Sequence, residues 1–251
     1  MANAYGSAKD LTKMEGCLKE LRDLHKKYKE KEIRGILAIG LNNAVNAYGN
    51  AKDLTKMEGC LKELRGFHKK YKGKEIRGIL VMGLHNAVNA YGSAKDLTKM
   101  EGCLKELRGL HEKYEEKEIR EELAKGLVNV ANYYRSAKDF TKIEGYLKEL
   151  RGFHEKYEEK EIRGILAGGL VNAVNIYGSA KDLTKMEDYL KELRELHEKY
   201  EEKEALEKFA SGLYNAALYY GSANDFAKMK DYLKELRDLH KKNRNNKNIR
   251  I

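Results

Sequence analysis

The chain of 251 residues lacks proline and tryptophan, and it contains only three cysteines. Charged residues make up 36% of the sequence and hydrophobic residues 41%. This balance is typical of helices with modest apolar stripes and exposed charged faces. The composition therefore favours helices and does not fit a disulfide-rich class.

Long hydrophobic runs are also missing. The first residues, Met1 to Ala4, show no basic leader followed by an apolar run, so no secretory signal is expected. The least polar stretch, Gly35 to Ala51, carries four asparagines and would make a poor membrane span. We expect a soluble, cytoplasmic protein without a membrane partner.

What the chain does contain is a 43-residue segment that recurs without insertion or deletion. A fixed period of this length is typical of a solenoid, in which each unit buries its apolar face against its neighbours. We therefore predict a single all-α solenoid domain over residues 1–251, with surfaces rather than pockets as sites. The copies span residues 4–46, 47–89, 90–132, 133–175, 176–218 and 219–251, the last being partial, and 243–251 is a polar tail.

The cysteines hold one position of the repeat, which the later copies fill with tyrosine. The residues are Cys17, Cys60, Cys103, Tyr146, Tyr189 and Tyr232. A position that accepts either residue is a packing position, because a free cysteine behaves as a small hydrophobe. Disulfides, zinc and other cofactors are not expected.

Each copy predicts two helices. In the first copy, apolar residues over 11–28 step by three and four, and Asp10 is a suitable N-cap. The second half, 32–48, is more apolar, as expected for a helix between layers. Gly49 and the polar residues after it end this second-type helix, before Asp53 caps the next first-type helix.

The join between the two helices, Tyr28 to Ile33, holds neither glycine nor proline and consists of good helix formers. A turn is nevertheless predicted, because the apolar phase slips there and a two-layer stack needs a reversal. Gly73 also stands at this place in the second copy. The alternative is one long bent helix per copy. The prediction is about eleven helices, beginning near the end of a second-type helix and finishing after a first-type one.

A helical wheel divides the second-type helix into two arcs. The broad arc, predicted to be buried, holds Ile33, Ile36, Leu37, Gly40, Leu41, Ala44, Val45, Ala47 and Tyr48. The other arc, predicted to face solvent, holds Ile39, Asn42, Asn43, Asn46, Gly49 and Asn50.

Two rows of asparagine recur along the solvent-facing arc, and two varied rows lie beside them. The amide rows are Asn43, Asn86, Asn129, Asn172 and Asn215, and Asn46, Asn89, Asn132 and Asn175. The varied rows are Ile39, Met82, Lys125, Gly168 and Ser211, and Asn42, His85, Val128, Val171 and Tyr214. Amides can pair with any peptide backbone while varied neighbours discriminate side chains, which predicts a groove for an extended peptide. The alternative is that the asparagines only link adjacent helices and the varied positions drift without constraint.

At these residues the chain resembles the tetratricopeptide repeat family. The family's aromatic-x2-Leu-Gly-x2-Tyr and Ala-x3-Phe pattern falls on Leu41, Ala44, Val45, Tyr48, Met57 and Leu61. The resemblance implies a right-handed superhelix whose concave groove is lined by Asn43 and Asn46, with Ile39 and Asn42 selecting the ligand. Val45 and Met57 depart from the family's small residues, the closing proline is absent, and the repeat exceeds the usual 34 residues, as in the kinesin light chain type.

Six histidines also hold one position, namely His25, His68, His111, His154, His197 and His240. Stacked repeats place equivalent residues roughly 10 Å apart, whereas zinc needs imidazole nitrogens at about 2.0 to 2.1 Å. Each histidine lies on the apolar seam of its helix, so a packed core or rim residue is expected. The copies show no nucleotide loop and no paired catalytic carboxylates, so neither an enzyme nor a metal site is predicted.

The net charge of +10 gathers at the two ends of the chain. Its main contributors lie at helix ends and loops, and include Lys26, Lys27, Lys29, Lys31, Lys69, Lys70, Lys72 and Lys74. Since a continuous basic track with interleaved aromatics is missing, specific nucleic-acid binding is not expected.

Three functional hypotheses follow from these features. The first is a non-catalytic scaffold that binds a peptide or a partner protein along the asparagine-lined face. The second is a self-assembling array with end-to-end contacts between copies, since the end of a solenoid exposes apolar surface. The third is weak, salt-sensitive binding of a polyanion through the basic terminal repeats.

Overall fold

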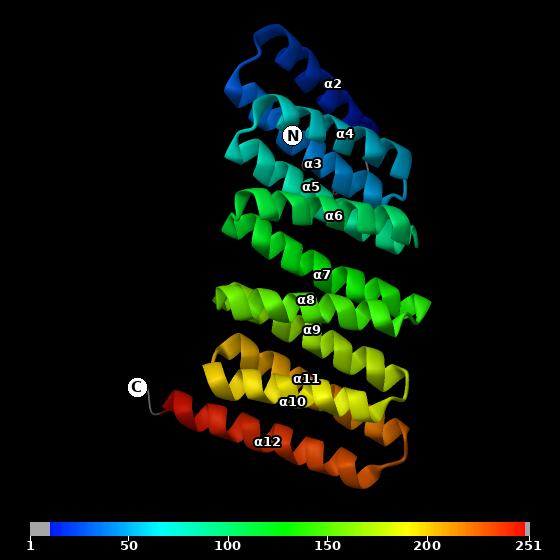
Figure 1. Cartoon of the computed structure of the whole chain (residues 1–251), viewed down its shortest axis with the longest axis vertical. Coiled ribbons are helices and arrows are strands. Elements are labelled where there is room, and N and C mark those ends of the chain that lie inside the picture. Colours follow the sequence, from blue (N-terminus) through cyan, green and yellow to red (C-terminus); the bar gives the residue numbers. More distant parts are fainter. Residues whose placement is uncertain (1–10, 249–251) are drawn as a thin grey trace. The chain divides into compact units, whose positions relative to one another are not determined.

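The computed structural model describes residues 11–248, and the side chains of residues 11–243 (Figure 1). These residues form eleven α-helices and no strand, which confirms the all-α prediction. The predicted cap at Asp10 and the predicted start near the end of a second-type helix lie outside the described residues. The helices are α2 (Leu11–Tyr28), α3 (Lys31–Asn50), α4 (Leu54–Tyr71), α5 (Lys74–Ser93), α6 (Leu97–Tyr114), α7 (Lys117–Ala137), α8 (Phe140–Tyr157), α9 (Lys160–Ser179), α10 (Leu183–Tyr200), α11 (Lys203–Ser222) and α12 (Phe226–Asn248).

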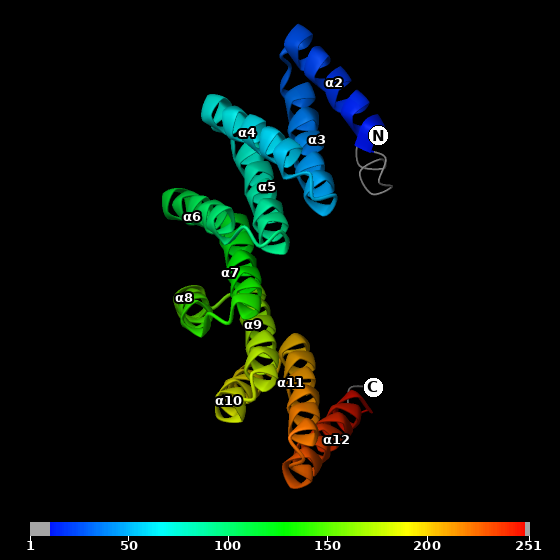
Figure 2. The same cartoon turned by 90° about the vertical axis from the view of Figure 1, so that its right-hand side faces the viewer.

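Contacts divide the chain into two compact units, Met1–Tyr133 and Tyr134–Ile251, and the boundary falls within α7. In each unit, consecutive helices pack against each other as in a helical repeat solenoid. Second-type helices also pack on one another, α3 on α5 in the first unit and α9 on α11 in the second. Within the second unit, α11 lies between α10 and α12 (Figure 2). The single domain over residues 1–251 stays a prediction.

The C-terminal segment differs from its prediction. Residues 243–248, expected to be a polar tail, continue helix α12 to Asn248. They contain no proline or glycine, and asparagine and lysine are compatible with the last turns of a helix. Residues 249–251 of the predicted tail lie outside the described residues.

A two-residue turn joins each first-type helix to the second-type helix that follows. Lys72 adopts a left-handed conformation with φ 51°, and its N–H donates to the carbonyl of His68. The equivalent Lys29, Glu115, Glu158 and Glu201 are left-handed as well. The predicted turn is confirmed, and the alternative of one bent helix per copy is wrong. The turn uses lysine or glutamate where glycine is usual, because the capping hydrogen bond outweighs a cost of about 1 kcal/mol.

The second turn of each copy is closed by the predicted aspartate. Asp53 accepts a hydrogen bond from the backbone N–H of Lys56 at 3.0 Å, and Asp96, Asp139, Asp182 and Asp225 do the same in their copies. The second-type helix ends as predicted, because α3 stops at Asn50, within the segment from Gly49 to Lys52. Lys52, with φ 61°, is the left-handed residue there.

Gly49 and its equivalents, near the ends of the second-type helices, also have a packing role. A Cβ on Gly92 would lie 2.3 Å from the ring of Tyr133, and one on Gly178 would lie 2.3 Å from the ring of Tyr219. The two tyrosine hydroxyls donate to the backbone carbonyls of Asn89 and Asn175, each at 3.1 Å. The wheel predicted that the arc holding Gly49 faces solvent. At Gly92 and Gly178 this prediction is wrong, because the next second-type helix covers the glycine.

The predicted core arc is buried from Leu37 to Tyr48, but Ile33 is half-buried and Ile36 is exposed. Leu37, Leu41 and Val45 are almost inaccessible, whereas Ile36 is 54% exposed. The equivalent Ile79 is buried, on the side of α5 that faces the preceding helix α3. Among the described residues, α3 has no second-type helix before it. Ile36 therefore has no such neighbour to cover it.

A carboxylate clamped by tyrosine and lysine joins neighbouring repeats. Glu144 accepts hydrogen bonds from the hydroxyls of Tyr177 and Tyr189, each at 2.6 Å, and from Lys185 at 3.2 Å. Glu15, Glu58 and Glu187 hold the equivalent place with their own tyrosine and lysine partners.

These clamps refine the prediction for the position shared by cysteine and tyrosine. Cys60, Cys103 and Tyr189 are buried, which confirms a packing position. All three cysteines are free, and burial raises the pKa of Cys60 and Cys103 to about 11. The tyrosine in the later copies adds a second hydroxyl to the carboxylate, a contribution that packing alone did not predict.

The Glu144 clamp predicts acid sensitivity. Burial raises the pKa of Glu144, but the hydrogen bonds from Tyr177 and Tyr189 outweigh it and hold the pKa below its ordinary value of 4.5. A carboxylate with a lowered folded-state pKa stabilises the fold above its unfolded pKa and loses that contribution as the pH falls through the folded pKa. Glu144→Gln should lower the unfolding free energy at pH 7 by about 1–3 kcal/mol and flatten its decline between pH 5 and pH 3. Urea unfolding followed by circular dichroism measures both, with exposed Glu155→Gln as the control, and an unchanged acid slope would contradict the clamp.

The close approach at Gly92 predicts a second stability effect. Gly92→Ala should lower the unfolding free energy by about 1–3 kcal/mol, because its methyl group meets the Tyr133 ring. The loss should shrink in a Tyr133→Ala background. Gly109→Ala is the matched control, since no atom lies within 4 Å of its Cβ, and should raise stability by about 0.5–1 kcal/mol. Chemical unfolding measures the four variants, and equal shifts at the two glycines would refute the packing role.

Candidate functional site

The predicted site residues lie on the second-type helices, α3, α5 and α7 in the first unit and α9 and α11 in the second. Their side chains are exposed or half-buried, as the wheel predicted for these positions. Ile39, Met82 and Tyr214 are among the most exposed large apolar residues of the described chain. The rows therefore occupy accessible surface in both units.

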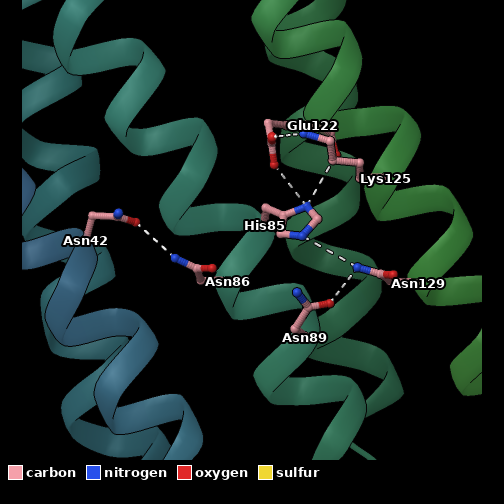
Figure 3. A network of polar contacts seen from close by, with 7 residues as sticks. All are labelled: Asn42, His85, Asn86, Asn89, Glu122, Lys125 and Asn129. Carbon is pink, nitrogen blue, oxygen red and sulfur yellow. Dashed lines mark hydrogen bonds and ion pairs between the residues drawn. The ribbon is translucent and has the colours of Figure 1, made fainter. Parts of the chain in front are cut away.

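In the first unit the asparagines join neighbouring helices. The amide nitrogen of Asn86 on α5 donates to the amide oxygen of Asn42 on α3 at 3.2 Å (Figure 3). The amide nitrogen of Asn129 on α7 donates to the amide oxygen of Asn89 on α5 at 2.9 Å. In each of these two pairs, an amide of one repeat is therefore hydrogen-bonded to an amide of the next repeat.

His85 extends this arrangement into a larger network (Figure 3). Its Nδ1 lies 3.2 Å from a carboxylate oxygen of Glu122, and its Nε2 lies 3.5 Å from the amide nitrogen of Asn129. Lys125 donates to the other oxygen of Glu122 at 2.7 Å. The roles of the two ring nitrogens depend on the tautomer, and with the proton on Nδ1 the Nε2 atom can accept from the amide.

Glu122 is a member of this network that the sequence analysis missed. Glu122 holds the place of Ile36, which the wheel assigned to the buried arc, and the second and fourth copies also have isoleucine at this place. A carboxylate at an otherwise apolar position, beside the histidine of the varied row, is the signal that could have identified it. The structure brings together Asn42, His85, Asn86, Asn89, Lys125 and Asn129 from the predicted set, and adds Glu122.

The network determines what the first unit can still bind. The amide nitrogen of Asn129 donates to Asn89 at 2.9 Å and lies 3.5 Å from Nε2 of His85, so the amide oxygen is the part of this side chain that stays without a partner. The carboxylate of Glu122 is shared by His85 and Lys125. These contacts favour the linking role for the asparagines of α5 and α7.

The second unit differs. The amides of Asn172 and Asn175 on α9 and of Asn215 on α11 make no hydrogen bond to another described residue. Asn175 and Asn215 are the counterparts of the bonded pair Asn89 and Asn129, yet they stay unpaired. Val171 replaces His85 in this unit, so the imidazole that holds the amide of Asn129 has no counterpart.

The remaining predicted residues are distributed along the same face. Asn46 is exposed and accepts a long hydrogen bond of 3.4 Å from Asn50. Asn43 is half-buried, with an amide nitrogen that is shielded from solvent and has no acceptor. The hydroxyl of Ser211 donates to the backbone carbonyl of Glu207 at 2.9 Å. Asn132 is exposed, and Val128 and Gly168 are half-buried.

Leu218 is a second residue that the sequence analysis missed. It holds the place of Asn46, Asn89, Asn132 and Asn175 in the last complete copy, and it is 52% exposed. The break in the asparagine row was the available signal. Together with Tyr214, it makes the end of the face on α11 apolar.

The histidine row packs as predicted except at its end, where His240 is exposed. His25 lies 3.3 Å from the hydroxyl of Tyr71, and His154 lies 3.4 Å from that of Tyr200, each tyrosine belonging to the next repeat. Burial lowers the pKa of His25, His68, His154 and His197. Within residues 11–248, no three His, Cys, Asp or Glu side chains are grouped to hold a metal ion.

The basic residues lie apart from the asparagine rows. The predicted lysines at positions 26, 27, 29, 31, 69, 70, 72 and 74 are exposed, at the turns between the first-type and second-type helices.

None of the described helices has the length and apolar character needed to cross a membrane.

Solved structures include chains whose fold is similar to that of this chain. The crystal structure of BtubC (BKLC) from P. vanneervenii has a TM-score of 0.62, covering 91% of this chain and 89% of that chain. The sequence identity is 15%, so the likeness shows the fold alone. No family model matches the sequence, and no curated protein matches it.

The different engagement of equivalent asparagines predicts different costs of removing them. Asn129→Ala should lower the unfolding free energy by about 0.5–1.5 kcal/mol more than Asn215→Ala, because only Asn129 has a partner amide. The gain in helix propensity is the same at the two equivalent positions and cancels. Urea unfolding of the two single variants measures the difference. Equal losses would show that the Asn129 hydrogen bonds contribute nothing to stability.

Proposed function

We propose that the chain is a non-catalytic scaffold that binds an extended peptide, or an extended segment of a partner protein, along the asparagine-bearing face of α9 and α11. The observation that carries this proposal is the set of unpaired amides on Asn172, Asn175 and Asn215. Each is half-buried and adjoins a varied residue, Val171 or Tyr214, or lies one turn from it. A fixed polar row beside varied side chains suits a ligand read along its backbone.

The spacing of the helices supports an extended ligand. Neighbouring packed helices lie about 8–10 Å apart, and an extended chain advances about 3.3 Å per residue. Asn172 on α9 and Asn215 on α11 would then meet peptide units about three residues apart. Each amide supplies both a donor and an acceptor, so it can pair with a peptide N–H or C=O whatever the ligand's sequence.

The neighbours of the amides give the ligand its preferences. Val171 supplies a small apolar surface, and Tyr214, which is 51% exposed, supplies an aromatic ring with a polar tip. A ligand with apolar side chains at the corresponding positions gains burial on both.

The resemblance to the tetratricopeptide repeat family supports the same face. Asn172 and Asn215 belong to the row of Asn43, and Asn175 belongs to the row of Asn46, which are the two positions that the resemblance assigns to groove asparagines. The first unit keeps these rows but engages Asn86, Asn89 and Asn129 in contacts between helices. We therefore propose the second unit as the principal ligand-binding part.

Peptide selection tests the proposal. A displayed library of random twelve-residue peptides is selected on the full chain, and the dissociation constants of the recovered peptides are measured by fluorescence anisotropy. Replacing Asn172 and Asn215 together by alanine should weaken binding by about 5- to 150-fold, because each lost hydrogen bond contributes about 0.5–1.5 kcal/mol. The variant should keep its helical circular dichroism spectrum.

The matched control replaces Lys191 and Lys234, which are exposed on the first-type helices α10 and α12, by alanine. This control should bind the selected peptides like the parent chain. The proposal fails if no saturable peptide is recovered. It also fails if the recovered peptides bind the asparagine variant and the parent equally.

A further inference from the structure

Helices α11 and α12 leave an apolar groove between them, which adjoins the asparagine-bearing face at Tyr214 and Leu218. At one end a cavity of about 540 Å³ is lined by residues that include Leu206, Ala210, Leu236 and Leu239. At the other end a cavity of about 380 Å³ is lined by residues that include Leu218, Gly221, Phe226 and Leu233. The two cavities follow one another along α11, so the groove extends over most of this helix.

One repeat earlier, the equivalent groove is filled by a helix. Helix α11 packs on both α9 and α10, and it buries Leu190 and Leu193 of α10 almost completely. The corresponding Leu233 and Leu236 of α12 are only half-buried. The internal contact of α11 with α9 and α10 therefore shows what kind of element fits between α11 and α12.

Three side-chain positions of α11 determine that fit. Phe209 stacks on His197, with ring centroids 5.7 Å apart. Gly212 leaves room for Leu190 and Leu193, which would lie 2.9 and 3.0 Å from a Cβ. Tyr219 covers Gly178 and donates to the carbonyl of Asn175. The contacts that close this groove come from an aromatic residue, a glycine three residues later and a tyrosine seven residues after that.

The tyrosine on glycine recurs in the first unit, where Tyr133 covers Gly92. In the α11–α12 groove, Gly221 holds the place of Gly92 and Gly178. The carbonyl of Leu218 holds the place of the carbonyls that accept from Tyr133 and Tyr219. The cavity of about 380 Å³ includes Gly221 and Leu218 in its lining. This end of the groove therefore has the glycine floor for a tyrosine side chain, while the carbonyl of Leu218 accepts from the hydroxyl of Ser222 at 2.9 Å and would have to exchange that partner for the tyrosine.

The charge at residue 230 distinguishes a single helix from a further repeat. Glu144 and Glu187 each receive a lysine from the following first-type helix. Lys230 stands at this position in the last copy and would repel such a lysine. A second copy that continued the array with its own first-type helix would therefore meet a like charge. A lone helix avoids it.

We propose that the α11–α12 groove is a docking site for one amphipathic helix of a partner protein, with an aromatic-x2-Gly-x6-Tyr pattern on its apolar face. By analogy with α11 on α9 and α10, the helix lies parallel to α11. Its tyrosine lies on Gly221, and its first turn lies near Arg237 and Lys241. An acidic residue in that first turn complements the two basic side chains, as Glu204 lies at the start of α11.

A synthetic peptide of residues 203–222 is the probe, because it carries Phe209, Gly212 and Tyr219 in the required pattern. Labelled at one end, it is titrated with the full chain, and fluorescence anisotropy gives the dissociation constant. Tyr219→Ala in the peptide should weaken binding at least tenfold. Tyr214→Ala in the peptide is the matched control and should leave binding unchanged, because Tyr214 lies on the exposed side of α11.

Variants of the full chain locate the site. Leu236→Lys should abolish binding of the peptide, whereas exposed Lys234→Glu should not, with circular dichroism confirming that both remain helical. The proposal is overturned if the peptide does not bind at millimolar concentration, or if the two peptide variants bind alike. It is also overturned if sedimentation shows that the chain associates with itself and that the peptide dissolves this complex, since the occupant is then a second copy.

Discussion

Every other feature depends on one constraint: a second-type helix cannot be buried within its own repeat. Leu37, Leu41 and Val45 are almost inaccessible because α3 packs against the first-type helices α2 and α4 and against the next second-type helix, α5. Glycine at the crossing permits this approach, since a Cβ on Gly40 would lie 3.2 Å from Leu18. An apolar stripe that needs neighbours on both sides makes stability a property of the boundaries between repeats.

The polar side chains at these boundaries follow from the same constraint. Arg22 pairs with Glu63 across one boundary, Arg65 with Glu106 across the next, and Arg194 with Glu235 in the second unit. The tyrosine and lysine clamps on Glu15 and Glu144 recur in the same way. Charged groups that are partly removed from water need partners, and a period without insertions places each partner at a constant distance along the chain. The boundary interactions are therefore copied together with the core.

The exposed arc of the second-type helices is the part of the repeat that this constraint leaves free. In the first unit its side chains join helices through Asn42, Asn86 and the network around His85. In the second unit the equivalent amides stay unpaired, and Tyr214 and Leu218 replace two polar positions. One face of one repeat can thus serve as a link in one place and as open surface in another. The difference arises from a few substitutions, such as Val171 in place of His85.

The sequence by itself determined the two helices of each copy, the aspartate caps and most of the core, because helical periodicity and capping are local properties of the chain. It did not determine that Gly49 packs closely against the next repeat, that Ile36 is exposed, or that Glu122 joins His85. Each of these depends on another repeat: Ala90 lies 41 residues after Gly49, Glu122 lies 37 residues after His85, and no described second-type helix precedes α3 to cover Ile36. The same holds for the amides, since identical asparagines are bonded at residue 129 and unpaired at residue 215. Only the tertiary structure decided these points, because a hydrogen bond or a close contact needs both partners in position, and a row of equal residues describes just one of them.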